Sequence, residues 1–323
     1  LSRGLGDVYK RQLANVPDGT SLSRTGKNAD WTRIQWEGKT GYISTAYISE
    51  TAKQKKTQIS AGSSSQGGAI AENGRQVLLD PNWDYAEFAK ITSGTAVLYQ
   101  SQTAERKNLT ICVNAGHGTK GGASVKTQCH PDGSPKVTGG TTGAGAVTAA
   151  AVSGGMTFDD GTPESSVTLS MALILKDKLL AKGYDVLMIR ETEDVQLDNI
   201  ARTLIANNAS DCHIALHWDS TSSNKGAFYM SVPNNAAYRN MEPVKSNWQK
   251  HNALGESLVA GLKEKGVKIF SGGSMEMDLT QTSYSTVPSV DIELGDKASD
   301  HSQAALKQLA DGLAAGIDQY FAG

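Results

Sequence analysis

From residue 107 to the C-terminus, short apolar runs alternate with longer amphipathic stretches. The stretch 164–183 repeats Val167, Met171, Leu175 and Leu179 at helical spacing, and Gly183 provides a C-terminal cap. This alternation predicts an α/β three-layer sandwich with a mainly parallel or mixed sheet. The predicted strands are TICVNAG (110–116), DVLMIR (185–190), CHIALHW (212–218), GAFYMSV (226–232) and SVDIEL (289–294), and the predicted helices cover 164–183, 197–208, 247–266 and 302–321.

The N-terminal part has a different pattern. Apolar and polar residues alternate in WTRIQW (31–36), and EGKTGY supplies a turn, so residues 13–50 are predicted to form a small all-β domain. Residues 51–76 are rich in Lys, Gln, Ser and Gly, which predicts a flexible linker. The catalytic domain is then expected at 77–323 with its core at 107–323, and an edge strand is expected at 95–101.

Composition excludes two classes of partner. The chain has 323 residues, of which 38% are hydrophobic, and a net charge of −2, so it lacks the basic surface that nucleic-acid binding needs. It contains no run of eighteen apolar residues, so no transmembrane helix is expected. The chain begins at Leu1, and its first segment, 1–12, fits nothing that follows; we interpret that segment as an artificial addition and exclude it from the fold.

The three cysteines are too few for a disulfide framework. Cys112 and Cys212 lie in apolar strands and are expected to be buried. Cys129 lies in a predicted loop and is expected to be the exposed thiol.

Four residues that could bind a metal or take part in catalysis lie at or near the ends of predicted elements. His117 follows the first core strand, His217 ends another, Glu293 belongs to the last strand, and Glu164 opens a helix. In a parallel sheet the ligand crevice lies beyond the carboxyl ends of the strands, so these residues are expected at one edge. Two imidazoles and a carboxylate form a typical catalytic zinc site, and a second carboxylate could carry protons.

The alternatives for these residues are ordinary ones. Either histidine could be a plain loop or core residue, and Glu164 could simply favour the positive end of its helix. Glu293 is harder to explain without a partner, because burying a carboxylate in a core strand is costly. Spacing alone does not choose among the six histidines; His213 is expected in the core, and His251 and His301 on helical or loop surface.

Residues 108–321 resemble the zinc-dependent N-acetylmuramoyl-L-alanine amidases of amidase type 3. The resemblance rests on the order and spacing of five segments: ICVNAGHGTKGG (111–122), 164–197, NIARTLIANNASDCHIALHWDS (199–220), SVDIELGD (289–296) and LADGLAAGIDQY (309–320). It implies that His117, Glu164 and His217 bind one zinc ion and that Glu293 is catalytic. The implied reaction is hydrolysis of the amide between N-acetylmuramic acid and L-alanine in peptidoglycan.

The chain departs from the family pattern in three places. Asn-Ala precedes Gly116 where the family usually has Asp-Pro, Trp218 follows the second histidine where a small residue is usual, and the stretch 119–163 is unusually long. A loop of this length between two ligands is expected to border the site as a lid or substrate-facing insert, or to be a tolerated surface insertion. Rival functions are a zinc peptidase that cuts within the stem peptide and a non-catalytic wall-binding protein.

Residues 13–50 resemble the bacterial SH3-type cell-wall domain. The similarity rests on Gly19-Thr20, Trp31, Trp36, Gly41-Tyr42-Ile43 and Tyr47-Ile48, whereas the family's first strand has no counterpart. Together the two resemblances imply a secreted, autolysin-type hydrolase located at the cell wall. The sequence does not indicate the oligomeric state.

Overall fold

The computed structural model describes residues 23–27, 31–36, 39–44 and 74–322. The chain divides into two compact units, Leu1–Gln66 and Gly67–Gly323, and each is described by itself. Segment 1–12 and nearly all of the predicted linker 51–76 lie outside the described residues.

In the first unit, the described residues form a three-stranded antiparallel sheet of order β1-β2-β3. Thr32 and Ile34 are buried and Arg33 is exposed, which is the period of two expected for 31–36. The remainder of the predicted SH3-type domain lies outside the described residues. The strands are β1 (Ser23–Lys27), β2 (Trp31–Trp36) and β3 (Lys39–Ser44).

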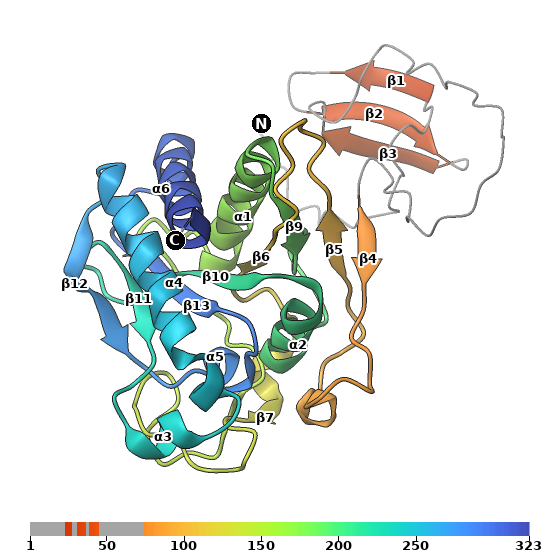
Figure 1. Cartoon of the computed structure of the whole chain (residues 1–323). Coiled ribbons are helices and arrows are strands. Elements are labelled where there is room, and N and C mark those ends of the chain that lie inside the picture. The colour runs from red at the N-terminus through yellow and green to blue at the C-terminus, as the bar shows by residue number, and fades with distance from the viewer. Residues whose placement is uncertain (1–22, 28–30, 37–38, 45–73, 323) are drawn as a thin grey trace, which may run out of the picture. The chain divides into compact units, whose positions relative to one another are not determined.

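The second unit is built on an eight-stranded mixed sheet of order β12-β11-β13-β10-β6-β9-β5-β4 (Figure 1). The pairs β13–β10, β10–β6, β6–β9 and β11–β12 are parallel, and the others are antiparallel. The strands are β4 (Arg75–Val77), β5 (Ala96–Tyr99), β6 (Thr110–Ala115), β9 (Asp185–Met188), β10 (Cys212–Asp219), β11 (Ala227–Ser231), β12 (Ile269–Glu276) and β13 (Ser289–Asp296).

Helices cover both faces of this sheet, which makes the predicted three layers (Figure 1). Helices α1, α4 and α6 bury their apolar sides on one face, against alternate residues such as Ile214 and Leu216 of β10. Helix α2 covers part of the other face, where it packs on Cys112 and Leu187. The helices are α1 (Glu164–Ala181), α2 (Asn199–Ala209), α3 (Ala236–Asn240), α4 (Val244–Glu264), α5 (Thr280–Tyr284) and α6 (Gln303–Ala322), with 3-10 turns η3 (Ala86–Phe88) and η4 (Gly122–Ser124).

All four predicted long helices are present, and Gly183 adopts the left-handed conformation that caps α1, with φ 91°. The sequence did not predict β12 or α5. Strand β12 contains Ser-Gly-Gly-Ser (271–274) and lacks the alternation of a half-buried strand, so its pairing depends on β11. Residues 95–101 do contain a strand, but β5 is not at the edge, because β4 pairs outside it.

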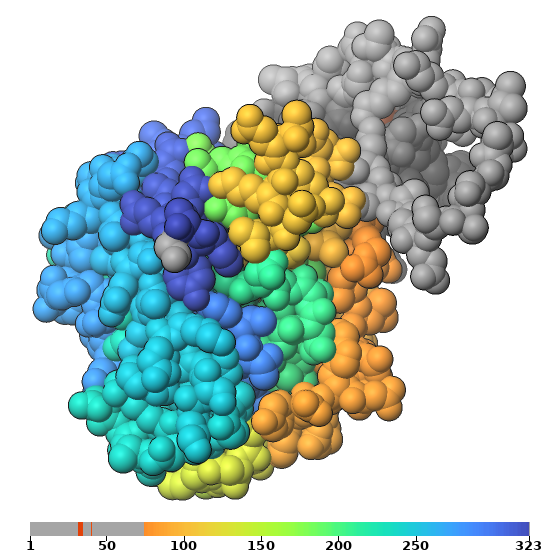
Figure 2. Space-filling view, in the orientation of Figure 1, coloured from red at the N-terminus to blue at the C-terminus, as the bar shows by residue number. Residues whose placement is uncertain are grey.

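The long insert 119–163 is folded. It contains η4 and an antiparallel pair formed by β7 (Lys126–Gln128) and β8 (Thr148–Ala150). In Figure 2 part of the insert (yellow) lies along the bottom of the unit, below a cyan surface, while the segment that begins at Gly74 (orange) lies on the right and α6 (dark blue) in the upper centre.

Two side chains are more buried than their sequence positions indicated. Cys129 is 1% exposed because the insert folds over it, so the predicted exposed thiol is wrong. His251 is also 1% exposed and accepts a hydrogen bond from the Ser289 amide, so it does not lie on the helix surface. Cys112, Cys212 and His213 are buried as predicted. Within the described residues, no helix is long and apolar enough to cross a membrane.

Candidate metal centre

The site is assembled at one edge of the sheet by three neighbouring parallel strands. Strands β6 and β13 flank β10 on either side, so their carboxyl ends lie together. His117 comes two residues after β6, His217 lies near the end of β10, and Glu293 is the register partner of His217 on β13. The topology therefore brings these three residues to the same edge, as their positions predicted.

Glu164 joins this edge from the first residue of α1, and three donor atoms converge. His117 Nε2 lies 2.9 Å from Glu164 Oε1, and His217 Nδ1 lies 3.2 Å from the same oxygen. The two imidazole nitrogens are 3.0 Å apart. Within the described residues this is the group of three potential ligands close enough to hold one metal ion.

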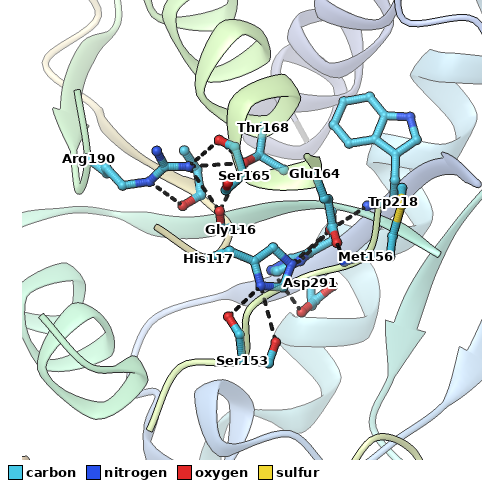
Figure 3. Close-up of polar contacts among 12 residues, drawn as sticks. Gly116, His117, Ser153, Met156, Glu164, Ser165, Thr168, Arg190, Trp218 and Asp291 are labelled. Atoms are coloured by element: carbon cyan, nitrogen blue, oxygen red, sulfur yellow. Dashed lines mark hydrogen bonds and ion pairs between the residues drawn. The ribbon is translucent and has the colours of Figure 1, made fainter. Parts of the chain in front are cut away.

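Two buried arginines hold the turn that carries His117. Arg202 of α2 donates to the His117 carbonyl oxygen over 2.7 Å and to the Ala115 carbonyl over 3.2 Å. Arg190, which follows β9, donates to the Gly116 carbonyl over 3.0 Å (Figure 3). His117 has a φ of 63°, a conformation that a residue other than glycine adopts at a cost. The arginines therefore hold the backbone in the conformation that directs His117 into the site.

Gly116 is required by close approach. A Cβ at this position would lie 2.3 Å from His217 Cε1 and 2.6 Å from the Leu216 carbonyl oxygen. No side chain can replace glycine here without moving His217.

His117 and Glu164 also make hydrogen bonds outside the donor cluster (Figure 3). His117 Nδ1 lies 2.9 Å from the Ser153 carbonyl oxygen, which can only accept, so this nitrogen carries the proton and Nε2 is left free to donate a lone pair. Glu164 Oε2 accepts from the Met156 amide over 2.8 Å, and Oε1 accepts from the Trp218 amide over 3.0 Å.

Electrostatics at the site favour a cation. Burial alone would keep His217 neutral, but the carboxylates of Asp291 and Glu164 outweigh it and raise the pKa of His217 to about 10. Burial likewise opposes charge on Glu164, yet its hydrogen bonds with His117 and His217 hold its pKa well below the ordinary value. The cluster thus keeps its carboxylate ionised and attracts positive charge.

Glu293 is 8% exposed, and its Oε2 has no hydrogen-bond partner. Burial, followed by the charge of nearby Asp291, raises the pKa of Glu293 well above its ordinary value. A carboxyl group whose protonated form is favoured in this way is suited to general acid and base chemistry.

These residues line a cleft of about 550 Å³. Helices and strands of the sandwich form its floor, and the insert forms one wall. The loop between β12 and α5, together with the start of α5, forms a second wall. The insert supplies Gly140, Thr141, Thr142, Ala149, Ala150 and residues 152–156, and the second wall supplies Met277, Leu279, Thr280 and Gln281. The insert therefore borders the cleft that holds the candidate site, as its position between two of the predicted ligands indicated.

Asp278, in the loop between β12 and α5, binds several groups of the insert. Its carboxylate is fully buried and accepts from the amides of Val137 and Thr138, over 2.7 and 3.1 Å, and from the Thr138 hydroxyl. It also binds His130 Nε2 and Lys136 Nζ, each over 3.0 Å. Because five donors from the insert meet one carboxylate, the two walls are tied together.

Sequence reasoning missed Arg190, Arg202, Asp278 and Asp291. A signal existed for two of them: Arg190 ends the predicted strand 185–190 directly after four apolar residues, and Arg202 lies among Ile200, Leu204 and Ile205 on the buried side of α2. A charged residue inside an apolar pattern requires a buried partner. Asp278 had no such signal, because its partners lie about 140 positions away in the sequence.

With the fold and the cluster described, comparison with known proteins defines the class. Residues 111–319 match the family N-acetylmuramoyl-L-alanine amidase, so the chain belongs to this family. It is a peptidoglycan amidase.

The chain is similar to several solved amidase structures. The apo form of the N-acetylmuramyl-L-alanine amidase Ami1 from Mycobacterium abscessus is similar over 68% of this chain and 100% of its own, with a TM-score of 0.50 and 20% identity. Ami1 from Mycobacterium smegmatis matches 67% of this chain and 97% of its own, with a TM-score of 0.49 and 21% identity. An N-acetylmuramoyl-L-alanine amidase from Clostridium difficile 630 matches 67% of this chain and 97% of its own, with a TM-score of 0.47 and 17% identity. No curated protein sequence matches the chain.

Proposed function

We propose that this amidase is a zinc enzyme that hydrolyses the amide between the lactyl group of N-acetylmuramic acid and the stem-peptide L-alanine. His117, Glu164 and His217 hold the ion, and Glu293 carries the proton. The observation that supports the proposal is the convergence of two imidazole nitrogens and one carboxylate oxygen, all within 4.8 Å of one another, beside an acid with an unpartnered oxygen.

The donor set fits zinc. Two neutral imidazoles and one carboxylate are typical ligands of a catalytic zinc site, which keeps a position open for water or substrate. The hydrogen bond from His117 Nδ1 to the Ser153 carbonyl selects the tautomer that such a site needs. When bound, zinc supplies a Lewis acid that polarises the scissile carbonyl and acidifies water.

Glu293 then performs the proton transfers. As a base it takes a proton from the attacking water, and as an acid it gives that proton to the departing alanine nitrogen. The second transfer is necessary because an unprotonated amide nitrogen is a poor leaving group. Its raised pKa, caused by burial and by Asp291, lets it hold the proton between the two steps.

The test replaces Glu293 with glutamine. Glu293→Gln is expected to bind one zinc ion per chain as the wild type does and to lose at least about 100-fold in kcat, the scale of general acid-base catalysis. Glu256→Gln, at an exposed position of α4, serves as the matched control and should keep both properties.

Analysis of the reaction products identifies which bond is hydrolysed. Mass spectrometry of digested peptidoglycan should find free L-alanine amino groups on intact stem peptides and muramic acid without a peptide. A split stem peptide would instead identify a peptidase, and the absence of any product in the zinc-loaded wild type would identify a binding protein. Release of stem peptide by Glu293→Gln at the wild-type rate would remove Glu293 from the mechanism.

We further propose that residues 13–50 form an SH3-type domain that holds the enzyme at the cell wall, outside the cell, and that 51–76 tether it to the catalytic domain. The three strands β1 to β3 and the chain's division near Gly67 support this arrangement. A weak second contact raises the local concentration of a tethered enzyme. Removal of residues 1–66 should therefore lower activity on whole walls more than on soluble fragments; equal losses would contradict a targeting role.

A further inference from the structure

Asp291 lies in the cleft, and the proposed mechanism gives it no role beyond its effect on the pKa of Glu293. It is two residues before Glu293 on β13, so the two carboxylates point to the same side of the sheet. The intervening Ile292 and the preceding Val290 point to the opposite side and belong to the apolar core. The alternation of β13 therefore places a second acid next to the catalytic one.

The carboxylate of Asp291 faces the outer nitrogen of His217. Its Oδ2 lies 3.6 Å from His217 Nε2, while Nδ1 of the same ring faces His117 and Glu164. This separation is that of an ion pair, and a movement of about 0.5 Å would bring the two atoms to hydrogen-bond distance. One imidazole thus meets the donor cluster on one side and an acid on the other.

The two histidines of the site have different outer partners. His117 directs its Nδ1 at the Ser153 backbone carbonyl, whereas His217 Nε2 faces the carboxyl group of Asp291. An outer acceptor fixes the tautomer of a metal-binding histidine, and a carboxylate also makes the imidazole a stronger donor.

The fold itself gains little from Asp291. Its Oδ1 is buried without a hydrogen-bond partner, and the negative charges of Glu164 and Glu293 lie nearby. An acid in such surroundings is expected to cost stability in the metal-free protein. A residue that adds little to the stability of the fold but faces a metal-binding histidine is best explained by its effect on that histidine.

We propose that Asp291 is a positioning residue for the metal centre. By pairing with His217 Nε2, its carboxylate would keep the proton on that nitrogen and leave the lone pair of Nδ1 on the side of Glu164 and His117, where the ion would bind. This inference rests on the proposed zinc site, since it assigns an outer partner to one of its ligands.

The test measures zinc affinity by chelator competition and the melting temperature of the metal-free full chain. Asp291→Leu is expected to weaken zinc binding about 10- to 100-fold. Asp291→Asn keeps an acceptor oxygen and should lose less than Asp291→Leu. The metal-free form of either variant should melt near the wild-type temperature, because the unpartnered Oδ1 is removed while Glu164 still pairs with His217.

Asp219→Asn provides the matched control. Asp219 also lines the cleft, but Lys225 and Thr221 bind its carboxylate, so the substitution removes a nearby charge without touching His217. It should leave zinc affinity within about twofold of the wild type, since the half-buried Asp219 charge is already paired with Lys225 and does not contact a ligand.

Three results would overturn the proposal. They are wild-type zinc affinity in Asp291→Leu, an equal loss of affinity in Asp219→Asn, and a loss of affinity matched by a lower melting temperature of the metal-free chain. A wild-type chain that binds no zinc would overturn the proposed function as well, so the two failures are distinguishable.

Discussion

The substitution Asp278→Ala tests how the cleft wall is held. Five donors from the insert bind the Asp278 carboxylate, and two of them belong to the side chains of His130 and Lys136. Removing one partner of a buried ion pair costs about 3–5 kcal/mol, because the remaining charge is left buried. For a domain of this size, that loss lowers the melting temperature by about 6–20 °C.

The assay combines thermal unfolding with limited proteolysis. If the insert detaches before the sandwich unfolds, the melting temperature changes less and cleavage within 129–147 becomes faster. Because Gly140 and Thr141 line the cleft beside the lost contact, KM for a soluble muropeptide should also rise. Asp132→Ala is the control in the same insert, since Asp132 is exposed and its carboxylate binds the neighbouring Ser134 amide.

The pH dependence of this effect has a definite sign. Burial opposes charge on Asp278, but hydrogen bonds from His130 and Thr138 hold its pKa well below the ordinary value. The contribution to stability is therefore complete above about pH 4 and is lost as the pH falls below that value. The difference between wild type and Asp278→Ala should shrink in acid. If the variant melts within one degree of the wild type and resists protease as well, Asp278 does not hold the insert in place.

Two further predictions concern buried basic groups. Arg202→Lys removes most of the bonds that hold the His117 turn, so it should weaken zinc binding at least about tenfold and destabilise the domain by about 2–4 kcal/mol, measured by chelator competition and urea unfolding. Burial lowers the pKa of His213 to about 3, so the unfolded state takes up the proton first and stability falls from about pH 6.5 down to 3. His213→Asn should reduce that slope by up to about 1.4 kcal/mol per pH unit, and an unchanged slope would exclude His213 as its source.

Hydrophobic periodicity was sufficient for the architecture of the second unit. The apolar positions of α1 and β10 repeat with periods that match a helix and a strand, and burial on the sheet follows those periods. Strand ends at 117, 217 and 293 predicted one common edge, because parallel strands share a direction. The local pattern predicted the helices, the strands and their common edge, since each of these properties is encoded in a few consecutive residues.

The same patterns failed where a partner lies far away in the sequence. Cys129 was expected to be exposed because its neighbours are loop residues, yet the insert folds over it. His251 was placed on a helix surface, although the Ser289 amide lies against its ring. Strand β12 has little periodicity of its own and exists through its pairing with β11.

The sequence by itself determined the layered α/β fold, the edge at which its polar residues gather, and, through family resemblance, the four residues proposed for chemistry. Only the tertiary structure showed that the insert forms a wall of the cleft, that Asp278 binds the insert, and that Asp291 faces the outer nitrogen of His217. The reason is physical. Periodicity records which side of an element is buried, whereas contacts between segments 70 to 140 residues apart depend on how the whole chain closes.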